Sequence, residues 1–395
     1  MTEGRADPGL AATPEMRTRG PKDLILLLLA WKAIFFLIVF ASLAILPNLF
    51  ALEIYQASFH WPRGAPPTVW THLSAWDGQH YLFLSEVGYN PSQSSNGMFP
   101  LWPAAIRIAA PLFAGSHLWS GLFLANAFSI AGMILFYRLA LERLGSGRAA
   151  DGALMFAIAA PGALFFSFIY SESLFFFLAV AMMLALVRGR WWWAVAASFL
   201  LPLVRGVGIF AIVPLFYETI RSWRSEGRIP WVRALGLLAP CLGIGIYFLI
   251  MKARLGDPLA GFDVQGKMFI SQRTVGDLFG IFAFLRSLVD FGSFHGFLDS
   301  SLDRAFFLIF AASLYPLWRL DRRLFFYALP IGLAPALTSL MAYTRYFMMA
   351  FPVFLVLGGV VASKKLWLLR ALLIGTALGL QVYLTIRHIN FYWAG

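Results

Sequence analysis

Long apolar stretches recur along this chain, and they constrain its fold more than any other feature. The first one, LILLLLAWKAIFFLIVFASLAIL at 24–46, exceeds the roughly 20 residues that an α-helix needs to cross a bilayer. With 60% hydrophobic and 13% charged residues, a water-soluble chain of 395 residues could not solvate its surface. The sequence therefore predicts an all-α polytopic membrane protein. Further spans are expected at about 117–141, 150–169, 172–187, 233–251, 304–319, 324–341, 346–362 and 366–385.

The apolar segment at 190–220 is ambiguous, because it contains Arg205 at its centre. A central arginine on a lipid-facing helix costs about 2.5–3.5 kcal/mol on insertion scales. We therefore expect the chain to break at Arg205-Gly206, giving two short spans and about eleven spans in all. The proline-rich stretch at 99–113 is too short to span and is expected at the outer surface or as a re-entrant piece.

Positive charges set the predicted orientation. With eleven spans and a cytoplasmic N-terminus, every cytoplasmic loop carries arginine or lysine, as the positive-inside rule requires. Residues 1–23 are then a disordered cytoplasmic tail, and residues 24–395 form a single transmembrane domain. Two long segments, about 47–116 and 252–303, face outward, and the polar residues with no role in orientation gather on that side.

Composition also excludes several classes of site. Cys241 is the single cysteine, so neither an intrachain disulfide nor a cysteine-based metal site can form. The six histidines have no HxxH or HxxxH spacing, and no DxD pair suggests a nucleotide-sugar metal, so we expect neither a metal nor a cofactor. The net charge of +12 is explained by arginines between spans rather than by binding to nucleic acid.

The segment WDGQHYLFLSEVGYN at 76–90 places a carboxylate, Asp77, at the outer membrane edge. Read as a helix over 76–87, it has an apolar and aromatic stripe, which predicts an interfacial helix with that face toward the membrane. Asp77 is then either a solvated residue of the first helical turn or a functional acid.

The motifs WDGQHYLFLSEVGY and FPLWP resemble the PIG-V-type mannosyltransferase family, the GPI mannosyltransferase 2 family with its prokaryotic relatives. The resemblance continues, in order, through APGALFFSFIYSESLFFFLA, LVRGVG, GDPLAGF and TRYFMMAFPVF, and so covers most of the chain. The stretch after GDPLAGFDVQ is largely unmatched. The family implies a GT-C fold, a polyprenyl-phosphate sugar donor, and a catalytic carboxylate in the first outer loop, which would make Asp77 the catalytic base.

General chemistry agrees with these implied roles. An acceptor hydroxyl needs a carboxylate to take its proton, and a leaving lipid phosphate needs cations. The best candidates for the donor phosphate are Arg205, flanked by glycines that would let a ligand approach, and Arg345; both could instead snorkel to headgroups. Lys267 and Arg273 in the second outer loop are secondary candidates.

Seven further residues of these motifs are candidates for substrate contacts. Glu172 could bind sugar hydroxyls or cap the following helix, and His80 could bond Asp77 or belong to the interfacial stripe. The full set is Trp76, Gln79, His80, Tyr81, Tyr89, Glu172 and Tyr346.

The sequence thus favours an inverting membrane mannosyltransferase with a polyprenyl-phosphate sugar donor and a glycolipid or other membrane-proximal acceptor. A transporter or flippase of lipid-linked sugars is the main alternative, but it would place charges near the membrane midplane in related halves, which are not visible here. A non-catalytic membrane scaffold remains the third alternative. The expected location is the bacterial inner (plasma) membrane, or the endoplasmic reticulum for a eukaryotic source.

Overall fold

The chain is described by a computed structural model that covers residues 18–228, 230–268, 288–289, 292–296, 300–338 and 340–395. Within these residues the structure is helical, apart from one isolated β-bridge between Ser293 and Ser300. The all-α prediction is confirmed.

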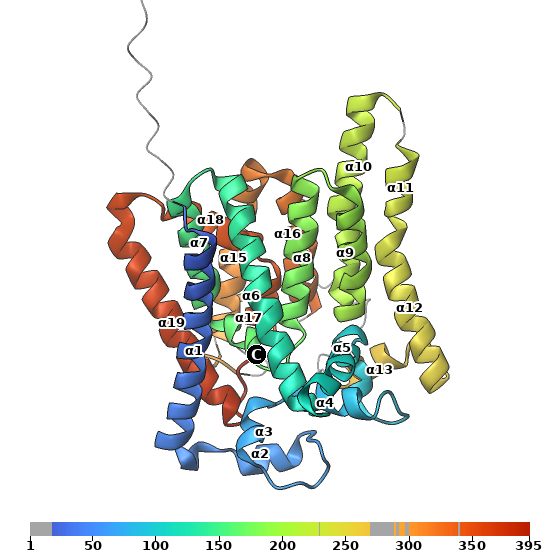
Figure 1. The fold of residues 1–395 in the computed structure, drawn as a ribbon, viewed down its shortest axis with the longest axis vertical. Helices are drawn as coiled ribbons and strands as arrows, with labels where there is room; N and C mark the ends of the chain where they lie inside the picture. Colours follow the sequence, from blue (N-terminus) through green and yellow to red (C-terminus); the bar gives the residue numbers. More distant parts are fainter. Residues whose placement is uncertain (1–17, 229, 269–287, 290–291, 297–299, 339) are drawn as a thin grey trace, which may run out of the picture.

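Most helices run roughly side by side in a bundle (Figure 1). The bundle consists of α1 (Pro21–Ile45), α6 (His117–Leu144), α7 (Gly147–Ala159), α8 (Glu172–Val187), α9 (Trp191–Val204), α10 (Ile212–Glu226), α11 (Trp231–Gly236), α12 (Leu238–Leu255), α15 (Ser301–Leu320), α16 (Arg322–Thr338), α17 (Tyr343–Met349), α18 (Pro352–Val360) and α19 (Trp367–Ile389).

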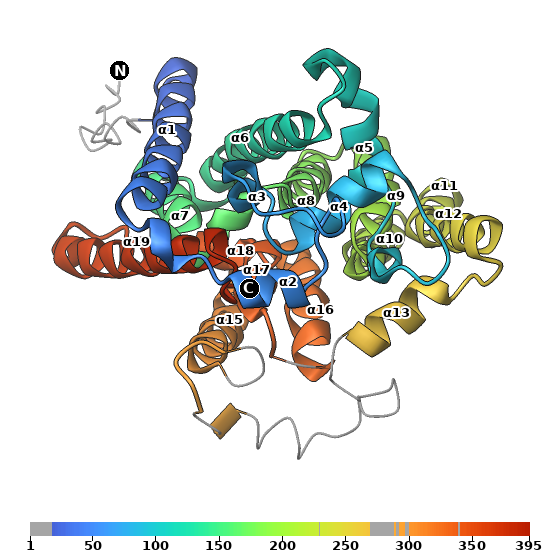
Figure 2. The same cartoon turned by 90° about the horizontal axis from the view of Figure 1, so that it is seen from below.

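Short helices of the first predicted outer loop lie across one end of this bundle (Figure 1). They are α2 (Leu52–Ala57), α3 (Val69–Leu73), α4 (Asp77–Glu86) and α5 (Leu101–Ala109), and α13 (Ala260–Met268) lies near the same end. Viewed from below, α3 and α4 lie near the centre of the molecule, close to α8 and α17 (Figure 2). This end of the bundle therefore brings together segments that are far apart in the sequence.

Four helices within the described part of the chain are long and apolar enough to cross a membrane by themselves: α1, α6, the α11–α12 pair and α19 with the turn before it. A fifth candidate is the pair α17 and α18, which is bent by 83°. The predicted break at Arg205 is confirmed, because α9 ends at Val204 and Arg205 is extended (φ −155°, ψ 142°). The predicted number of eleven spans is not confirmed, since the remaining described helices are too short or not apolar enough to cross a membrane by themselves.

The bundle contains a second break between α7 and α8, where the chain forms the 3₁₀-helix η4 (Pro161–Phe166). Backbone carbonyls at such a break must find donors, because the bilayer core offers no water. Side chains from three flanking helices supply them: Lys32 of α1, Asn126 of α6 and Gln381 of α19. The bonds run from Lys32 Nζ to Phe166 O (2.9 Å), from Asn126 Nδ2 to Ser167 O (3.1 Å), and from Gln381 Nε2 to Ile158 O and Ala160 O (both 2.9 Å).

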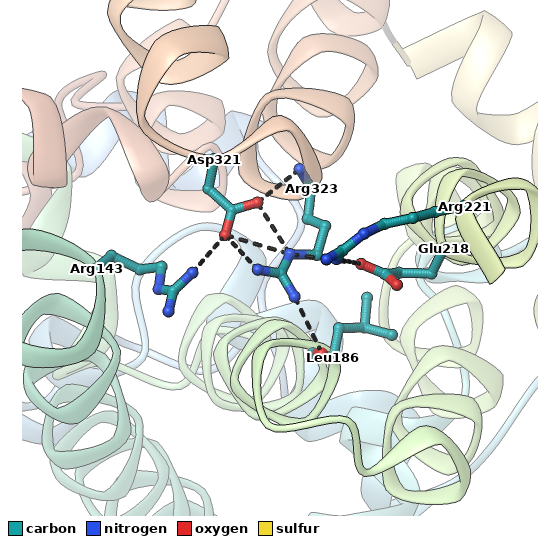
Figure 3. A network of polar contacts seen from close by, with 6 residues as sticks. All are labelled: Arg143, Leu186, Glu218, Arg221, Asp321 and Arg323. Atoms are coloured by element: carbon teal, nitrogen blue, oxygen red, sulfur yellow. Dashed lines mark hydrogen bonds and ion pairs between the residues drawn. The ribbon is translucent and has the colours of Figure 1, made fainter. Parts of the chain in front are cut away.

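At the end of the bundle away from α4, three arginines predicted to set orientation take part in ion pairs. Asp321 accepts from Arg143 (2.9 Å) and from Arg323 (2.8 Å), and Arg188 pairs with Glu142. Figure 3 shows how Asp321 joins α6 to the start of α16, with Glu218 and Arg221 of α10 beside Arg323. These arginines therefore also connect helix ends.

Candidate functional site

Four charged residues, each at or near the end of a helical segment, meet near the end of the bundle where α4 lies: Asp77, Glu172, Arg205 and Arg345. We call them the four-charge cluster. Asp77 is the first residue of α4, Glu172 is the first of α8, Arg205 follows α9, and Arg345 lies in the first turn of α17.

Arg345 and Glu172 hold the four-charge cluster together. Arg345 donates from Nη2 to Asp77 Oδ2 (2.8 Å) and from Nε to Glu172 Oε1 (2.6 Å). Arg205 Nη1 donates to the same Glu172 oxygen (2.8 Å). Glu172 Oε1 therefore bridges both arginines, whereas within the cluster the Asp77 side chain bonds Arg345 and not Arg205. The formal charges of the cluster sum to zero.

Exposure distinguishes the two carboxylates. The Glu172 side chain is only 1% exposed, whereas that of Asp77 is 27% exposed, the highest in the cluster. Arg345 lies at 9% and Arg205 at 16%. Asp77 is thus the more accessible of the two carboxylates, and Glu172 is a buried partner of the arginines. The sequence predicted Glu172 either as a sugar ligand or as a helix cap. Neither alternative included a glutamate that bonds both Arg205 and Arg345.

Electrostatics around Asp77 favour its charged form. Burial acts to raise the pKa of Asp77, but the charge and hydrogen bond of Arg345 at 2.8 Å, together with other nearby positive charges such as Arg205, outweigh it, so the pKa lies below its ordinary value. The neighbouring His80 is buried, which lowers its pKa to about 4 and keeps it neutral near neutral pH. His80 therefore adds no positive charge to the site.

The start of α4 is fixed by an unusual backbone. Trp76 has φ 56°, a conformation that bulky residues rarely adopt. Its ring stacks on Phe391 at 6.0 Å and meets Trp393 edge-on at 5.8 Å. These contacts hold Trp76 beside the cluster, and Asp77 begins the helix where a carboxylate is favoured by the helix dipole.

Two residues of the motif YSES also reach the cluster, although the sequence did not assign them a role. The Tyr170 hydroxyl accepts from Asp77 N (3.3 Å), and its ring lies 5.0 Å from the guanidinium carbon of Arg345. The Ser171 hydroxyl bonds Tyr81 (2.9 Å) and lies 3.4 Å from Arg205 Nη1. The sequence did contain a signal for this role, because Tyr170 and Ser171 are polar residues directly before Glu172 between two apolar segments.

The prediction that the apolar face of α4 is turned toward the membrane is wrong, because all residues from Gly78 to Ser85 are buried within the protein. His80 stacks on Phe59 (4.2 Å between ring centroids) and its Nδ1 lies 2.9 Å from Ser95 Oγ, so it neither bonds Asp77 nor faces lipid. A helical stripe in sequence cannot tell protein from membrane as its apolar neighbour, and here the neighbour is protein.

Two more predicted substrate residues are occupied by contacts within the first loop. Gln79 accepts from Trp61 N and donates to Ser74 Oγ, both at 2.8 Å. The Tyr89 hydroxyl donates to Met98 O (2.7 Å). In the structure as it stands, these side chains serve the loop rather than the cluster.

The remaining predictions fall as follows. Tyr81 reaches the cluster through Ser171, and the Tyr346 ring lies 5.6 Å from the Arg205 guanidinium carbon. Lys267 belongs to α13 without a described side chain, and Arg273 lies outside the described residues. The space beside Gly206, expected to admit a ligand, is filled by protein, since a Cβ there would meet Phe99 Cζ at 2.8 Å.

One family model matches about half of the chain. The model of the mannosyltransferase (PIG-V) family matches residues 23–225, which include Asp77, Glu172 and Arg205 but not Arg345. The chain belongs to this family. Its GT-C fold, expected from the resemblance, is confirmed together with the family.

Individual relatives cover less of the chain. Mouse GPI alpha-1,6-mannosyltransferase 2 is 32% identical over 193 residues, which is 45% of this chain and 38% of the mouse protein. The human protein of the same name is 31% identical over 164 residues, 39% of this chain and 33% of its own length. The chain thus matches 33–38% of the length of these two relatives.

A solved structure extends the likeness in fold to nearly the whole chain. ArnT from Cupriavidus metallidurans, bound to undecaprenyl phosphate, aligns with a TM-score of 0.53 at 15% identity. The alignment covers 91% of this chain and 64% of ArnT. With its apolar helices, this likeness identifies an integral membrane protein.

Proposed function

We propose that this chain is an inverting mannosyltransferase that moves a sugar from a polyprenyl-phosphate donor to a hydroxyl group of a membrane-proximal acceptor. The observation that carries the proposal is the four-charge cluster, in which a reachable carboxylate contacts an arginine that also shares a buried glutamate. Such a pairing supplies both groups that the reaction requires, a proton acceptor and a phosphate ligand.

In the proposed step, the acceptor oxygen attacks the anomeric carbon of the donor sugar. Asp77 accepts the proton of that hydroxyl group as the new carbon–oxygen bond forms. The bond between the anomeric carbon and the phosphate oxygen breaks, and its electron pair stays on the phosphate. The leaving phosphate needs no proton if cations hold its charge, so one carboxylate suffices.

The charge balance of the cluster indicates how the donor enters. Two carboxylates and two arginines sum to zero, so a phosphodiester added to this arrangement would leave one excess negative charge. Arg345 can pair with the phosphate if its Nη2 turns away from Asp77, while its Nε still donates to Glu172. Donor binding then releases the Asp77 carboxylate, which becomes a stronger base without its cationic partner.

The identity of the sugar and of the lipid rests on the comparisons. The relatives' name indicates mannose, and the lipid phosphate bound to ArnT supports a polyprenyl-phosphate donor. A glycolipid acceptor at the outer face of the bacterial inner membrane agrees with the arginine distribution in the sequence. In a eukaryotic cell the equivalent face would be the lumen of the endoplasmic reticulum.

Transfer by the purified protein tests the proposal. The full chain in lipid nanodiscs, given radiolabelled polyprenyl-phosphate mannose and a panel of hydroxyl-bearing membrane lipids, should form a new labelled glycolipid. Asp77→Asn is the matched control for chemistry. A flippase would move the labelled donor across a vesicle membrane without forming a new glycosidic bond. That outcome, with no transfer to any acceptor, would replace the transferase proposal.

A further inference from the structure

Arg345 lies in a helix whose own sequence does not fix its beginning. The seven-residue helix α17 starts after Ala342, which has φ 57° and no side chain that can bond the first backbone N–H groups. A short helix without such a cap frays readily. Yet Arg345, in its first turn, must meet Asp77 and Glu172 with bonds of 2.8 and 2.6 Å.

A carboxylate from another helix supplies the missing acceptor. Asp303, in the first turn of α15, accepts from Thr344 N through Oδ1 at 2.8 Å. The Asp303 side chain is completely buried, and its residue precedes Thr344 by 41 positions. The contact therefore ties the residue next to Arg345 to the end of a bundle helix.

Asp303 is itself held from the other side. Its backbone N–H donates to Ser300 Oγ (3.1 Å), and that hydroxyl group lies 3.0 Å from His295 Nδ1. His295 Nδ1 is 3.7 Å from Asp303 Oδ2. Burial lowers the pKa of His295 to about 4, so this histidine is neutral near neutral pH and acts through hydrogen bonding alone.

The opposite side of Thr344 has equally little space. A Cβ added at Gly162 of η4 would come too close to the Thr344 carbonyl oxygen and would meet Met348 Cγ at 2.8 Å. Thr344 thus lies between two neighbours: its N–H donates to Asp303, and its carbonyl group packs against the backbone of Gly162. We call these two contacts the Thr344 clamp. A side chain that cannot accept a bond at position 303 would loosen one half of this clamp.

We infer that Asp303 is a positioning residue, which sets the Arg345 guanidinium in place through the Thr344 amide. The inference rests on the proposed function, because Arg345 is assigned there to the donor phosphate. Asp303 does not itself touch the four-charge cluster in any contact described above, so its effect should pass through α17 alone.

Three variants of the full chain in nanodiscs separate this role from simple stabilisation. Asp303→Leu keeps approximate size but removes the acceptor, and Asp303→Asn retains a side-chain oxygen. Asp321→Leu is the control, a buried carboxylate at the opposite end of the bundle (Figure 3). The first readout is amide hydrogen exchange of the peptide 343–349, and the second is the Kd for polyprenyl phosphate, both below the unfolding temperature.

We expect Asp303→Leu to speed exchange in 343–349 and to weaken polyprenyl phosphate binding by roughly two- to ten-fold, the usual net worth of a hydrogen bond. Asp303→Asn should restore both values nearly to wild type. Asp321→Leu should lower thermal stability but leave both values unchanged.

Unchanged exchange in Asp303→Leu would overturn the inference whatever the enzyme does. Faster exchange with unchanged binding, failure of Asp303→Asn to rescue, or an equal loss in Asp321→Leu would overturn it as well. If wild-type protein does not bind polyprenyl phosphate at all, the proposed function itself fails, and the role assigned to Asp303 fails with it. The wild-type measurement therefore tells the two failures apart.

Discussion

Asp77 has one ionic partner in the four-charge cluster, and that partner is shared with Glu172. At the scale of single residues, this difference in partners suits the two carboxylates to different roles, Asp77 as the proton acceptor and Glu172 as the residue that positions the arginines. Glu172 is buried and bonds both arginines, whereas Asp77 is partly exposed and can lose Arg345 to a phosphate and still face the acceptor. The variants below test that division.

Replacing Asp77 by asparagine should abolish proton transfer while keeping shape. Asparagine begins a helix about as well as aspartate, but its amide cannot accept a proton at neutral pH. Transfer measured with excess donor should fall by roughly 10²–10⁴, the usual contribution of a general base. Asp77→Glu should also be slow, because a displacement of about 1 Å can cost 10². Full activity of Asp77→Asn, at unchanged thermal stability, would remove Asp77 from catalysis.

The two arginines should differ in what their loss does. Arg205→Ala leaves Glu172 paired with Arg345, so we expect weaker donor binding, by about 1.5–3 kcal/mol, and a folded protein. Arg345→Ala leaves Asp77 without its ionic partner, while Arg205 stays paired with the buried Glu172, and should cost about 1–3 kcal/mol of stability in addition. The sequence alone predicts that both alanine variants remain folded.

Donor titrations and thermal unfolding of both variants check this difference. Adding Asp77→Asn to Arg345→Ala removes the unpaired charge and should recover part of the lost stability but none of the donor binding. Equal stability of the two single variants would contradict the role of Arg345 as the ionic partner of Asp77.

The sequence predicted that all four cluster residues lie on the outer side, and the family resemblance pointed to Asp77 as the catalytic carboxylate. It could not predict which of the four residues contact one another. Arg345 and Asp77 are 268 positions apart, and no local pattern encodes a contact over such a distance. The glycines beside Arg205 misled for the same reason, since the ring that fills their space, Phe99, comes from another element.

At the scale of elements, the break between α7 and α8 is the feature that positions Tyr170, Ser171 and Glu172. Its carbonyls are bonded by Lys32, Asn126 and Gln381 from three different helices. A buried lysine in an apolar helix commonly indicates a functional site. Here its two bonds, to Phe166 O and Ser167 Oγ, give it a structural explanation instead.

Lys32→Met should therefore destabilise the protein by about 1–3 kcal/mol, because two buried acceptors lose their donor. Lys22→Met on the same helix is the matched control, since Lys22 is exposed. Thermal unfolding in nanodiscs measures both variants. Equal stability of Lys32→Met and Lys22→Met would show that the break is satisfied without Lys32.

The sequence predicted where helices begin and end better than it predicted what each helix packs against. The break at Arg205 was predictable because an arginine in a lipid-facing helix is costly, and α9 does end there. The burial of α4 was not, because its neighbours Phe59, Ser95 and Ser171 come from outside the helix.

For the whole molecule, the predicted orientation can be tested by labelling. After Cys241 is replaced by serine, single cysteines at Ser92 and Ser225, both exposed, serve as reporters. A membrane-impermeant maleimide added to intact cells should modify position 92 and not position 225, because arginine-rich loops stay inside. The reverse pattern would place the four-charge cluster on the cytoplasmic side.

The ion pair between Asp77 and Arg345 also connects the protein to the acidity of the compartment that its site faces. In the free protein Arg345 lowers the pKa of Asp77. If the donor phosphate draws Arg345 away and adds its own negative charge, that pKa must rise. The complex then binds more protons than the free protein within the range between the two pKa values, so donor affinity should increase as pH falls through that range and level off above it.

Calorimetric titration of polyprenyl-phosphate mannose in buffers of different ionisation enthalpy would count the protons taken up. Asp77→Asn should take up none and show no such pH dependence, and uptake equal to that of wild type would place the coupling elsewhere. An acidic compartment would thus favour loading of the donor while leaving fewer Asp77 carboxylates free to act as base, so capture and transfer would have different pH optima.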